Sequence, residues 1–145
     1  MQQRIRKITE ADRGSVFAMM RQFYSSPAVF TDGSDEIFKS DIDACLSDSP
    51  YIEGFVFECD GENCGYAMIA KSFSTEFGKP CIWIEDLFIK ENFRNAGLGS
   101  AFFAFIEKEY PDALFRLEVE DENEGAVRLY KKCGFDFLPY LEMKK

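Results

Sequence analysis

The chain has 145 residues, the length of one ordinary domain, and 46% of them are hydrophobic, which is enough for one core. Its net charge of −9 argues against nucleic-acid binding, which needs clustered Lys and Arg, and is compatible with a cationic partner. The absence of histidine excludes Ser-His-Asp and Cys-His catalysis and removes the commonest metal ligand. We therefore expect one metal-free domain over residues 1–145.

The front of the chain predicts one strand followed by two helices. Residues 4–8 read as a short strand, and Thr9 begins a helical pattern with Asp12 where a capping box places an acid. That helix ends at residues 25–27, Ser-Ser-Pro, and residues 32–34, Asp-Gly-Ser, start a second one. The apolar faces of these two helices are formed by Val16, Met20 and Phe23 and by Phe38, Ile42 and Cys45.

The middle of the chain is rich in predicted strands. Residues 55–59 and 65–72 are apolar runs that flank Asp60-Gly61, a hairpin signal, and residues 81–89 form a third run. Cys59 and Cys64 stand on either side of the turn and are near enough in sequence to approach each other. Because the five cysteines include no Cys-x-x-Cys pair, we expect reduced and mostly buried thiols.

The back of the chain predicts helix, strand, helix and strand. A helical spacing is followed by residues 114–119, which alternate as a strand, and Asn123 is suited to cap a second helix that ends at Gly134. Phe135 and Phe137 alternate as a last strand. The first of these helices carries Leu98, Phe102, Phe105 and Ile106 on one face.

The complete order, β-α-α-β-β-β-α-β-α-β, predicts an α/β fold with a single mixed sheet and helices on both faces. Its front half is antiparallel and its back half is a βαβ unit. The N-terminus lacks the apolar run of a signal peptide, and the stretch AFFAFI is too short to cross a bilayer, so we expect a cytoplasmic protein without membrane contact.

Residues 94–100, Arg-Asn-Ala-Gly-Leu-Gly-Ser, follow a predicted strand and open a helix. A helix N-terminus offers free backbone N–H groups, and glycines allow a pyrophosphate to approach the main chain. A plain strand-to-helix turn with packing glycines is the alternative. A Rossmann fold needs a small residue where Phe102 stands, and a P-loop needs a Gly-Lys-Ser/Thr ending, so coenzyme A is the leading ligand.

Two motifs in this half of the chain resemble the GNAT superfamily of acetyl-CoA-dependent N-acetyltransferases. The first, a strand followed by Arg/Gln-x-x-Gly-x-Gly/Ala and a helix, stands here as IEDLFIKENFRNAGLGSAFF. The second, Asn-x-x-Ala-x-x-Leu/Phe-Tyr-x-x-x-Gly-Phe, stands at residues 123–135. The strand IEDLFI followed by Arg94 is also similar to the polyamine (diamine) acetyltransferases.

The resemblance implies a GNAT-like fold and acetyl-CoA as co-substrate. It implies that main-chain groups of Leu87 and Ile89 bond the pantetheine arm, that residues 94–100 hold the pyrophosphate, and that Tyr130 lies beside the thioester sulfur. The implied cofactor-binding residues are Leu87, Phe88, Ile89, Arg94, Asn95, Ala96, Gly97, Leu98, Gly99, Ser100, Asn123, Tyr130 and Lys132. Relatives that pair through C-terminal strands make a homodimer the implied assembly.

Without histidine, the general base for a protonated amine must be a carboxylate, a tyrosine or a water chain. Strand alternation places Trp83, Glu85, Leu87 and Ile89 on one face and Ile82, Ile84, Asp86 and Phe88 on the other. Glu85 thus shares a face with the implied thioester site and is the candidate base, against a structural or solvated acid. Tyr130 is the candidate general acid toward the leaving thiolate, against a tyrosine of the core.

Acids in the front half are further candidates for binding a cationic acceptor, since the segment between the first two helices lines the acceptor site in this family. Glu85, Asp86 and Asp32 are the predicted substrate-binding residues, with a solvated helix face as the alternative for the front-half acids. The favoured function is acetyl transfer from acetyl-CoA to a small cationic amine by direct attack in a ternary complex. The alternatives are a coenzyme A-binding module without activity and an acetyltransferase of a protein N-terminus or lysine.

Overall fold

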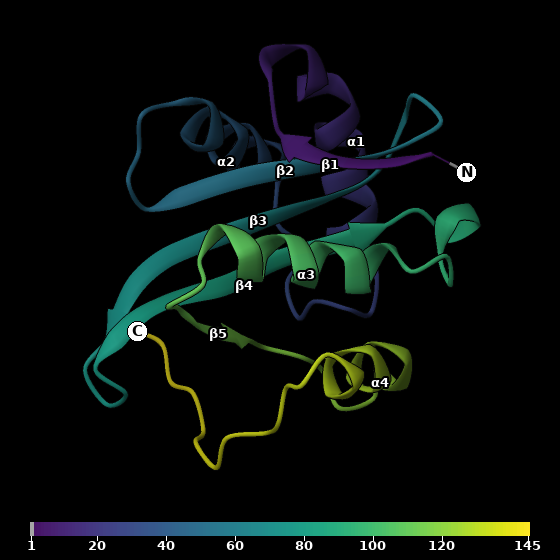
Figure 1. Ribbon diagram of the computed structural model, residues 1–145. Coiled ribbons are helices and arrows are strands. Elements are labelled where there is room, and N and C mark those ends of the chain that lie inside the picture. Colours follow the sequence, from purple (N-terminus) through teal and green to yellow (C-terminus); the bar gives the residue numbers. More distant parts are fainter. Residues whose placement is uncertain (1) are drawn as a thin grey trace.

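One five-stranded sheet organises the chain in the computed structural model, which describes residues 2–145 (Figure 1). The strand order is β1-β2-β3-β4-β5; the first four strands are antiparallel neighbours, and β5 is parallel to β4. The strands are β1 (Gln3–Lys7), β2 (Ile52–Cys59), β3 (Glu62–Ser74), β4 (Lys79–Ile89) and β5 (Leu114–Leu117). The helices are α1 (Arg13–Tyr24), α2 (Asp35–Leu46), α3 (Leu98–Glu109) and α4 (Glu124–Lys132), with short 3-10 turns η1 (Glu10–Asp12) and η2 (Glu91–Phe93).

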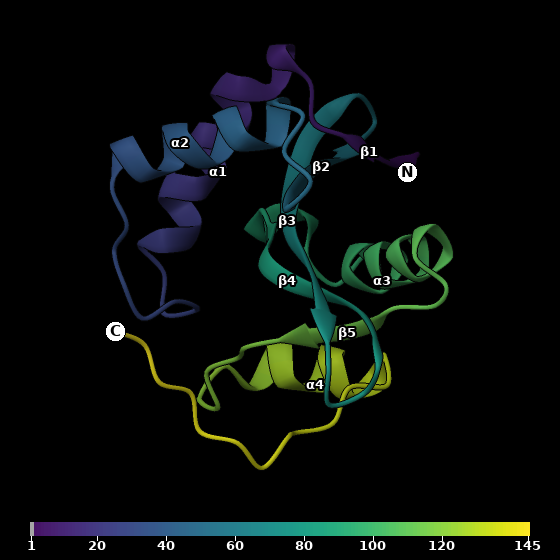
Figure 2. The ribbon, with the colours of Figure 1, turned by 90° about the vertical axis from the view of Figure 1, so that its left-hand side faces the viewer.

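Helices cover both faces of the sheet, as the sequence predicts. α1 and α2 lie on one face and α3 on the other (Figure 2). Under α1 and α2 the buried side chains include Val16, Met20, Ile42, Val56, Tyr66, Met68 and Phe88. Under α3 they include Phe57, Ala67, Ile69, Ile84, Leu98, Phe102 and Ile106. The three central strands β2, β3 and β4 therefore contribute residues to both of two separate apolar layers.

Local capping chemistry sets where the first helices begin. The backbone N–H of Thr9 donates to Asp12 Oδ2 at 2.8 Å, which is one half of the predicted capping box. Ser34 Oγ accepts the backbone N–H of Ile37 at the start of α2, so the predicted restart of the chain at this position is confirmed.

The predicted strand at Phe135 and Phe137 is not formed, so the observed order ends with α4. Residues 135–145 run as an extended segment without strand pairing, and the Phe137 side chain is 62% exposed. Pro139 in this segment lacks the N–H that a strand would donate, which disfavours regular pairing beside β5. Within residues 2–145, β5 therefore has β4 as its only strand neighbour.

Candidate active site

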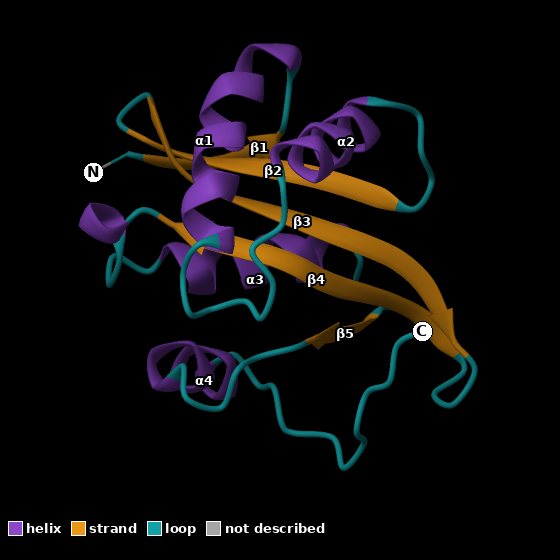
Figure 3. Cartoon of the chain, turned by 180° about the vertical axis from the view of Figure 1, so that it is seen from behind, coloured by secondary structure: helices purple, strands orange, loops and turns teal. Residues whose placement is uncertain are grey.

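A β-bulge at Glu85 organises the centre of the site. β4 pairs with β3 so that Met68 faces Asp86 while Ile69 faces Ile84, which leaves Glu85 as an extra residue. Such a bulge reverses the alternation of all residues beyond it. β5 pairs with β4 only from Cys81 to Ile84, so β4 continues past the bulge without a neighbour on that side (Figure 3).

The bulge changes which residues of β4 point to each side of the sheet, so the simple alternation predicted from the sequence is wrong beyond Glu85. Ile84 and Leu87 both pack on the α3 side, whereas Asp86 and Phe88 lie on the side of α1 and α2. Ile84 and Asp86 were expected on one face, and so were Trp83 and Leu87, because simple alternation carries no sign of an extra residue. Glu85 is thereby freed from both layers and is exposed.

Two tyrosines hold Asp86 beneath the bulge. Tyr24 Oη donates to Asp86 Oδ1 at 2.8 Å, and Tyr66 Oη donates to Asp86 Oδ2 at 2.7 Å. Asp86 is 3% exposed, and burial raises its pKa, while the two hydroxyl groups oppose that rise. Burial raises the pKa of both tyrosines, and the charge and hydrogen bond of Asp86 raise it further. Asp86 is therefore a positioned charge under the site rather than a freely accessible binding group.

Further carboxylates gather around Glu85 from three distant parts of the chain. The charges of Glu85 and Asp86 act on Asp41 of α2, and Glu142 of the C-terminal segment acts on Glu85. Glu118, directly after β5, forms a hydrogen bond with Glu142. We call Asp41, Glu85, Asp86, Glu118 and Glu142 the carboxylate cluster. Within residues 2–145, no lysine or arginine forms an ion pair with any of its members.

Four members of the cluster have raised pKa values, chiefly through burial and the presence of neighbouring carboxylates: Asp41, Glu85, Asp86 and Glu118. Burial raises the pKa of Asp41 to about 6, helped by the charges of Asp86 and Glu85. The hydrogen bond with Glu142, followed by burial, raises the pKa of Glu118 to about 7. Burial and the neighbouring Asp86 and Glu142 likewise raise the pKa of Glu85. The cluster is thus an uncompensated negative site, suited to a cation.

Asp41→Asn is expected to stabilise the fold at pH 8, by about 1 kcal/mol in the free energy of unfolding after allowance for solvent screening. The raised pKa means that Asp41 favours the folded state when protonated, and that this contribution is lost as pH rises through about 6. Asparagine removes the charge repulsion, so the gain should vanish near pH 4. Urea unfolding at both pH values measures it.

The matched control for that prediction is Asp43→Asn on the same helix. Asp43 pairs with Arg13 at 2.8 Å, so its removal should leave stability unchanged or slightly lower. Equal behaviour of the two variants at pH 8 would show that Asp41 is not under electrostatic stress.

The predicted phosphate turn has the expected strand-to-helix geometry. Asn95 and Gly97 adopt the left-handed backbone conformation, with φ of 61° and 82°, and Gly97 is the N-cap of α3. No side chain within residues 2–145 caps this helix, so its first N–H groups face outward without an internal acceptor. A Cβ at Gly97 would meet no atom within 4 Å, which leaves open space for an anion. Arg94 donates through Nε to the carbonyl oxygen of Ile89 at 2.8 Å.

Gly99 serves packing rather than anion access. A Cβ at this position would lie 2.7 Å from Leu129 Cδ2 of α4, so the glycine permits close contact between α3 and α4. Cys133 Sγ lies 3.9 Å from Ser100 Oγ at the same junction. The two sequence motifs, which are separated by a strand, therefore meet in space. Asn123 caps α4 by accepting the N–H of Ala126 at 3.3 Å, and Lys132 is exposed.

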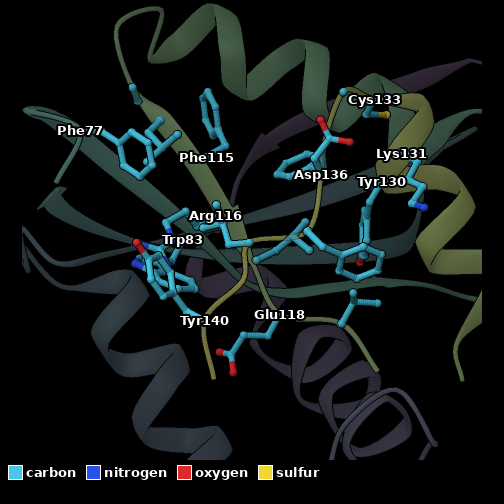
Figure 4. A pocket seen from close by; sticks show the side chains of 18 of the residues that line it. Phe77, Trp83, Phe115, Arg116, Glu118, Tyr130, Lys131, Cys133, Asp136 and Tyr140 are labelled. Carbon is cyan, nitrogen blue, oxygen red and sulfur yellow. The ribbon is translucent and has the colours of Figure 1, made fainter. Parts of the chain in front are cut away.

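A cavity of about 610 Å³ lies between α4, β5 and the C-terminal segment (Figure 4). Tyr130 of α4 and Cys133 at its C-cap line it, together with Glu118 and Glu142 of the cluster; Asp41, Glu85, Asp86 and the turn at residues 94–100 do not. Burial raises the pKa of Tyr130 to about 12, and its ring packs edge-on against Phe103 and Phe135. Tyr130 is thus packed against the core and also lines the cavity.

The predicted substrate residues differ in their surroundings. Asp32 is exposed in the loop before α2, whereas Glu85 and Asp86 belong to the carboxylate cluster. Tyr24 and Glu118 were not predicted as site residues, whereas Asp41 is one of the front-half acids expected as candidates for cation binding. Asp41 follows Phe38 by one helical turn and so lies at the edge of the buried face, a spacing that singles it out from the other acids of α2.

Comparison with known proteins gives one family. Residues 17–135 match the Acetyltransferase (GNAT) family. The thialysine N-epsilon-acetyltransferase of Sus scrofa is 30% identical over 143 residues, covering 90% of this chain and 82% of that protein. The solved structure of AAC(6')-Iy in complex with a bisubstrate analogue has a TM-score of 0.83 at 14% identity and covers 100% of this chain and 98% of that chain. A possible acetyltransferase from Clostridium difficile 630 also has a TM-score of 0.83, at 16% identity, over 100% of this chain and 97% of that one. Among the described residues, no helix is long and apolar enough to span a membrane.

Proposed function

Because the chain belongs to the Acetyltransferase (GNAT) family and is an N-acetyltransferase that uses acetyl-CoA, we propose that its acceptor is a small cationic amine. The amine attacks the acetyl group directly while both substrates are bound, and residues 1–145 act as one catalytic domain. The observation that carries this proposal is the carboxylate cluster, in which Asp41, Glu85 and Glu118 all have raised pKa values and no basic partner.

The cluster supports a cation because an ammonium group would relieve the repulsion among its members. Thialysine N-epsilon-acetyltransferase, the relative from Sus scrofa, is named for a substrate that carries an amine. A protein substrate would need a broad surface, whereas these carboxylates come from α2, β4 and the C-terminal segment and each acts on at least one other member of the cluster. A small amine fits this convergence better than a folded protein does.

In the proposed reaction, different residues of this chain bind the cofactor, hold the amine, accept its proton and stabilise the leaving sulfur. Acetyl-CoA supplies the acetyl thioester when it is bound, and the turn before α3 holds its pyrophosphate through backbone N–H groups. An alkyl ammonium has a pKa of about 10.4, so its neutral form costs roughly 4.6 kcal/mol at pH 7. Glu85 accepts that proton, directly or through water, while Asp41 and Glu118 hold the cation in place. Tyr130 donates a hydrogen bond to the leaving sulfur.

The test is free-thiol release from acetyl-CoA with a panel of polyamines, amino acids with side-chain amines, aminoglycosides and lysine peptides. The proposal expects turnover with small amines and a KM that falls as the number of positive charges rises. Turnover with peptides alone would instead show that the acceptor is a protein lysine or N-terminus. Tight binding of acetyl-CoA without release of its free thiol in the presence of any amine would indicate a coenzyme A-binding module without transfer activity.

The amine KM should depend on pH through the cluster. Between pH 5.5 and pH 8, deprotonation of Asp41 and Glu118, with pKa values of about 6 and about 7, adds negative charge where the ammonium binds. The KM of the amine should fall by about 10-fold or more over that range, while the dissociation constant of acetyl-CoA stays nearly constant. A flat amine KM, measured by initial rates at saturating acetyl-CoA, would contradict the assignment.

Tyr130→Phe should slow turnover by only about 10-fold. Burial raises the pKa of Tyr130 to about 12, well above the roughly 8.5 of a free thiol, so the hydroxyl stabilises the leaving sulfur by hydrogen bonding more than by full proton transfer. The comparison is kcat at saturating substrates, with Tyr51→Phe, at a 72% exposed position, as control. An unchanged kcat would leave Tyr130 with its packing role alone.

The C-terminal segment exposes several large apolar side chains. We propose a homodimer formed through the C-terminal segment, where Phe137, Leu141 and Met143 expose apolar side chains next to the unpaired edge of β5. Sedimentation analysis of the full chain tests it, and a monomer at micromolar concentration would exclude it.

A further inference from the structure

Two buried thiols face each other at the closed end of the β2–β3 hairpin. Cys59 Sγ and Cys64 Sγ lie 2.6 Å apart, and the residues are 2% and 0% exposed. Nonbonded heavy atoms normally rest at roughly 3.5–4.0 Å, whereas a disulfide requires about 2.05 Å. Within residues 2–145, Cys45, Cys81 and Cys133 make no such sulfur–sulfur contact. The pair is therefore distinct among the five cysteines.

The backbone holds these thiols together by two independent devices. Asp60 and Gly61 both have positive φ, 51° and 84°, as a tight two-residue hairpin turn requires. Phe57 faces Gly65 while Glu58 faces Asn63, so Cys64 is an extra residue in β3 and forms a second β-bulge. Both cysteines lie in the apolar layer under α3. Only a small closing movement of the sulfur atoms separates this arrangement from a bond.

We propose that Cys59 and Cys64 form a modification site, a dithiol that a low-molecular-weight disulfide such as oxidised glutathione converts into an intramolecular disulfide. One cysteine attacks the small disulfide and releases one small thiol; the second cysteine attacks the resulting mixed disulfide and releases the other. The two cysteines lose two electrons to the small disulfide, and their two protons leave on the two released thiols.

Because the two cysteines are buried, we expect this reaction to be slow. The pair also lies beside the strand end that leads into the turn before α3. Burial and the neighbouring Cys59 raise the pKa of Cys64 to about 12, so the thiolate forms when the hairpin end opens. The carbonyl oxygen of Cys64 accepts the N–H of Lys90 at 2.8 Å, directly before η2 and the turn that starts α3. A disulfide would thus fix the strand end from which that turn departs.

The experiment incubates the full reduced chain with oxidised or reduced glutathione and maps it with a protease that cleaves after glutamate. Cleavage after Glu58 and Glu62 places Cys59 and Cys64 in different peptides that only a disulfide joins. We expect the joined peptides and a mass lower by about 2 Da after oxidation. The melting temperature should rise by about 5 °C.

A variant with Cys45, Cys81 and Cys133 replaced by alanine should keep the mass change, and Cys64→Ala should lose it. The peptide map of the unmodified chain decides the matter even if Cys64→Ala folds poorly. Free thiols at both positions after prolonged incubation, or glutathione attached only at Cys45 or Cys133, would overturn the proposal. Because none of these measurements uses acetyl transfer, their outcome is separate from that of the proposed acceptor.

Discussion

Glu85→Gln is expected to lower kcat/KM for the amine by about 100-fold at pH 7, within the range attributed to a general base. Glutamine keeps the size of the side chain and the bulge of β4 but cannot accept the proton. Because burial and the neighbouring Asp86 and Glu142 raise the pKa of Glu85, removing its charge should leave the free energy of unfolding at pH 7 unchanged or slightly higher, never lower. Initial rates of thiol release, combined with urea unfolding of the same samples, separate a chemical effect from a structural one.

The pH dependence of that variant provides a second readout. As pH approaches the roughly 10.4 pKa of an alkyl amine, more acceptor is neutral in solution and less help is needed from a base. The deficit of Glu85→Gln relative to the unmodified enzyme should therefore shrink as pH rises from 7 to 9.5. Glu36→Gln, on the exposed first turn of α2, is the matched control and should retain full activity. If Glu85→Gln lowers kcat/KM for the amine by less than threefold at pH 7, another group accepts the proton from the amine.

Gly65→Ala is expected to reduce the free energy of unfolding by about 3 kcal/mol, a large part of the stability of an ordinary domain. A Cβ at Gly65 would lie 2.6 Å from the carbonyl oxygen of Phe88 and 2.7 Å from Cδ2 of Phe57. The oxygen belongs to the neighbouring strand β4 and cannot move aside as a flexible side chain would. Relief therefore requires β3 and β4 to separate next to the site.

The control for Gly65→Ala is Gly14→Ala in α1, where a new Cβ meets no atom within 4 Å. This substitution should stabilise the fold by about 0.5 kcal/mol, since alanine favours a helix over glycine. If the close contact at Gly65 causes the destabilisation, chemical denaturation will show changes of opposite sign in the free energy of unfolding of the two variants. Similar values for the two variants would show that the strands adjust to a methyl group at little cost.

The sequence predicted a single sheet with helices on both faces, and its prediction failed where an extra residue changed the register of a strand. Hydrophobic spacing in α3 and the cap at Asn123 have local causes, so they are visible in the chain itself. The bulge at Glu85 depends on the pairing of Ile69 with Ile84, which no local pattern encodes. The same limit hid Glu118, because its approach to Glu142 depends on the path of residues 135–145 after α4.

The tyrosine pair on Asp86 shows a different limit. Tyr66 stands in an apolar stretch of β3 and Tyr24 at the end of α1, and each fits the pattern of a core residue. Their hydroxyl groups converge on one carboxylate only because β3, β4 and α1 stack at that point. Sequence reasoning predicts Asp86 as a substrate-binding residue, and the structure adds the two hydroxyl donors that fix the position of its carboxylate.

The bulge in β4 places Glu85 outside the regular pairing of the sheet. Ile69 pairs with Ile84 and the preceding Met68 pairs with Asp86, so deleting residue 85 would leave Asp86 and Leu87 on the faces that they already occupy. Replacing the side chain disturbs no apolar packing either, because Glu85 belongs to neither layer. A chain without residue 85 would therefore keep its sheet and lose only the carboxylate that the bulge presents, which makes this deletion a change in chemistry rather than in fold.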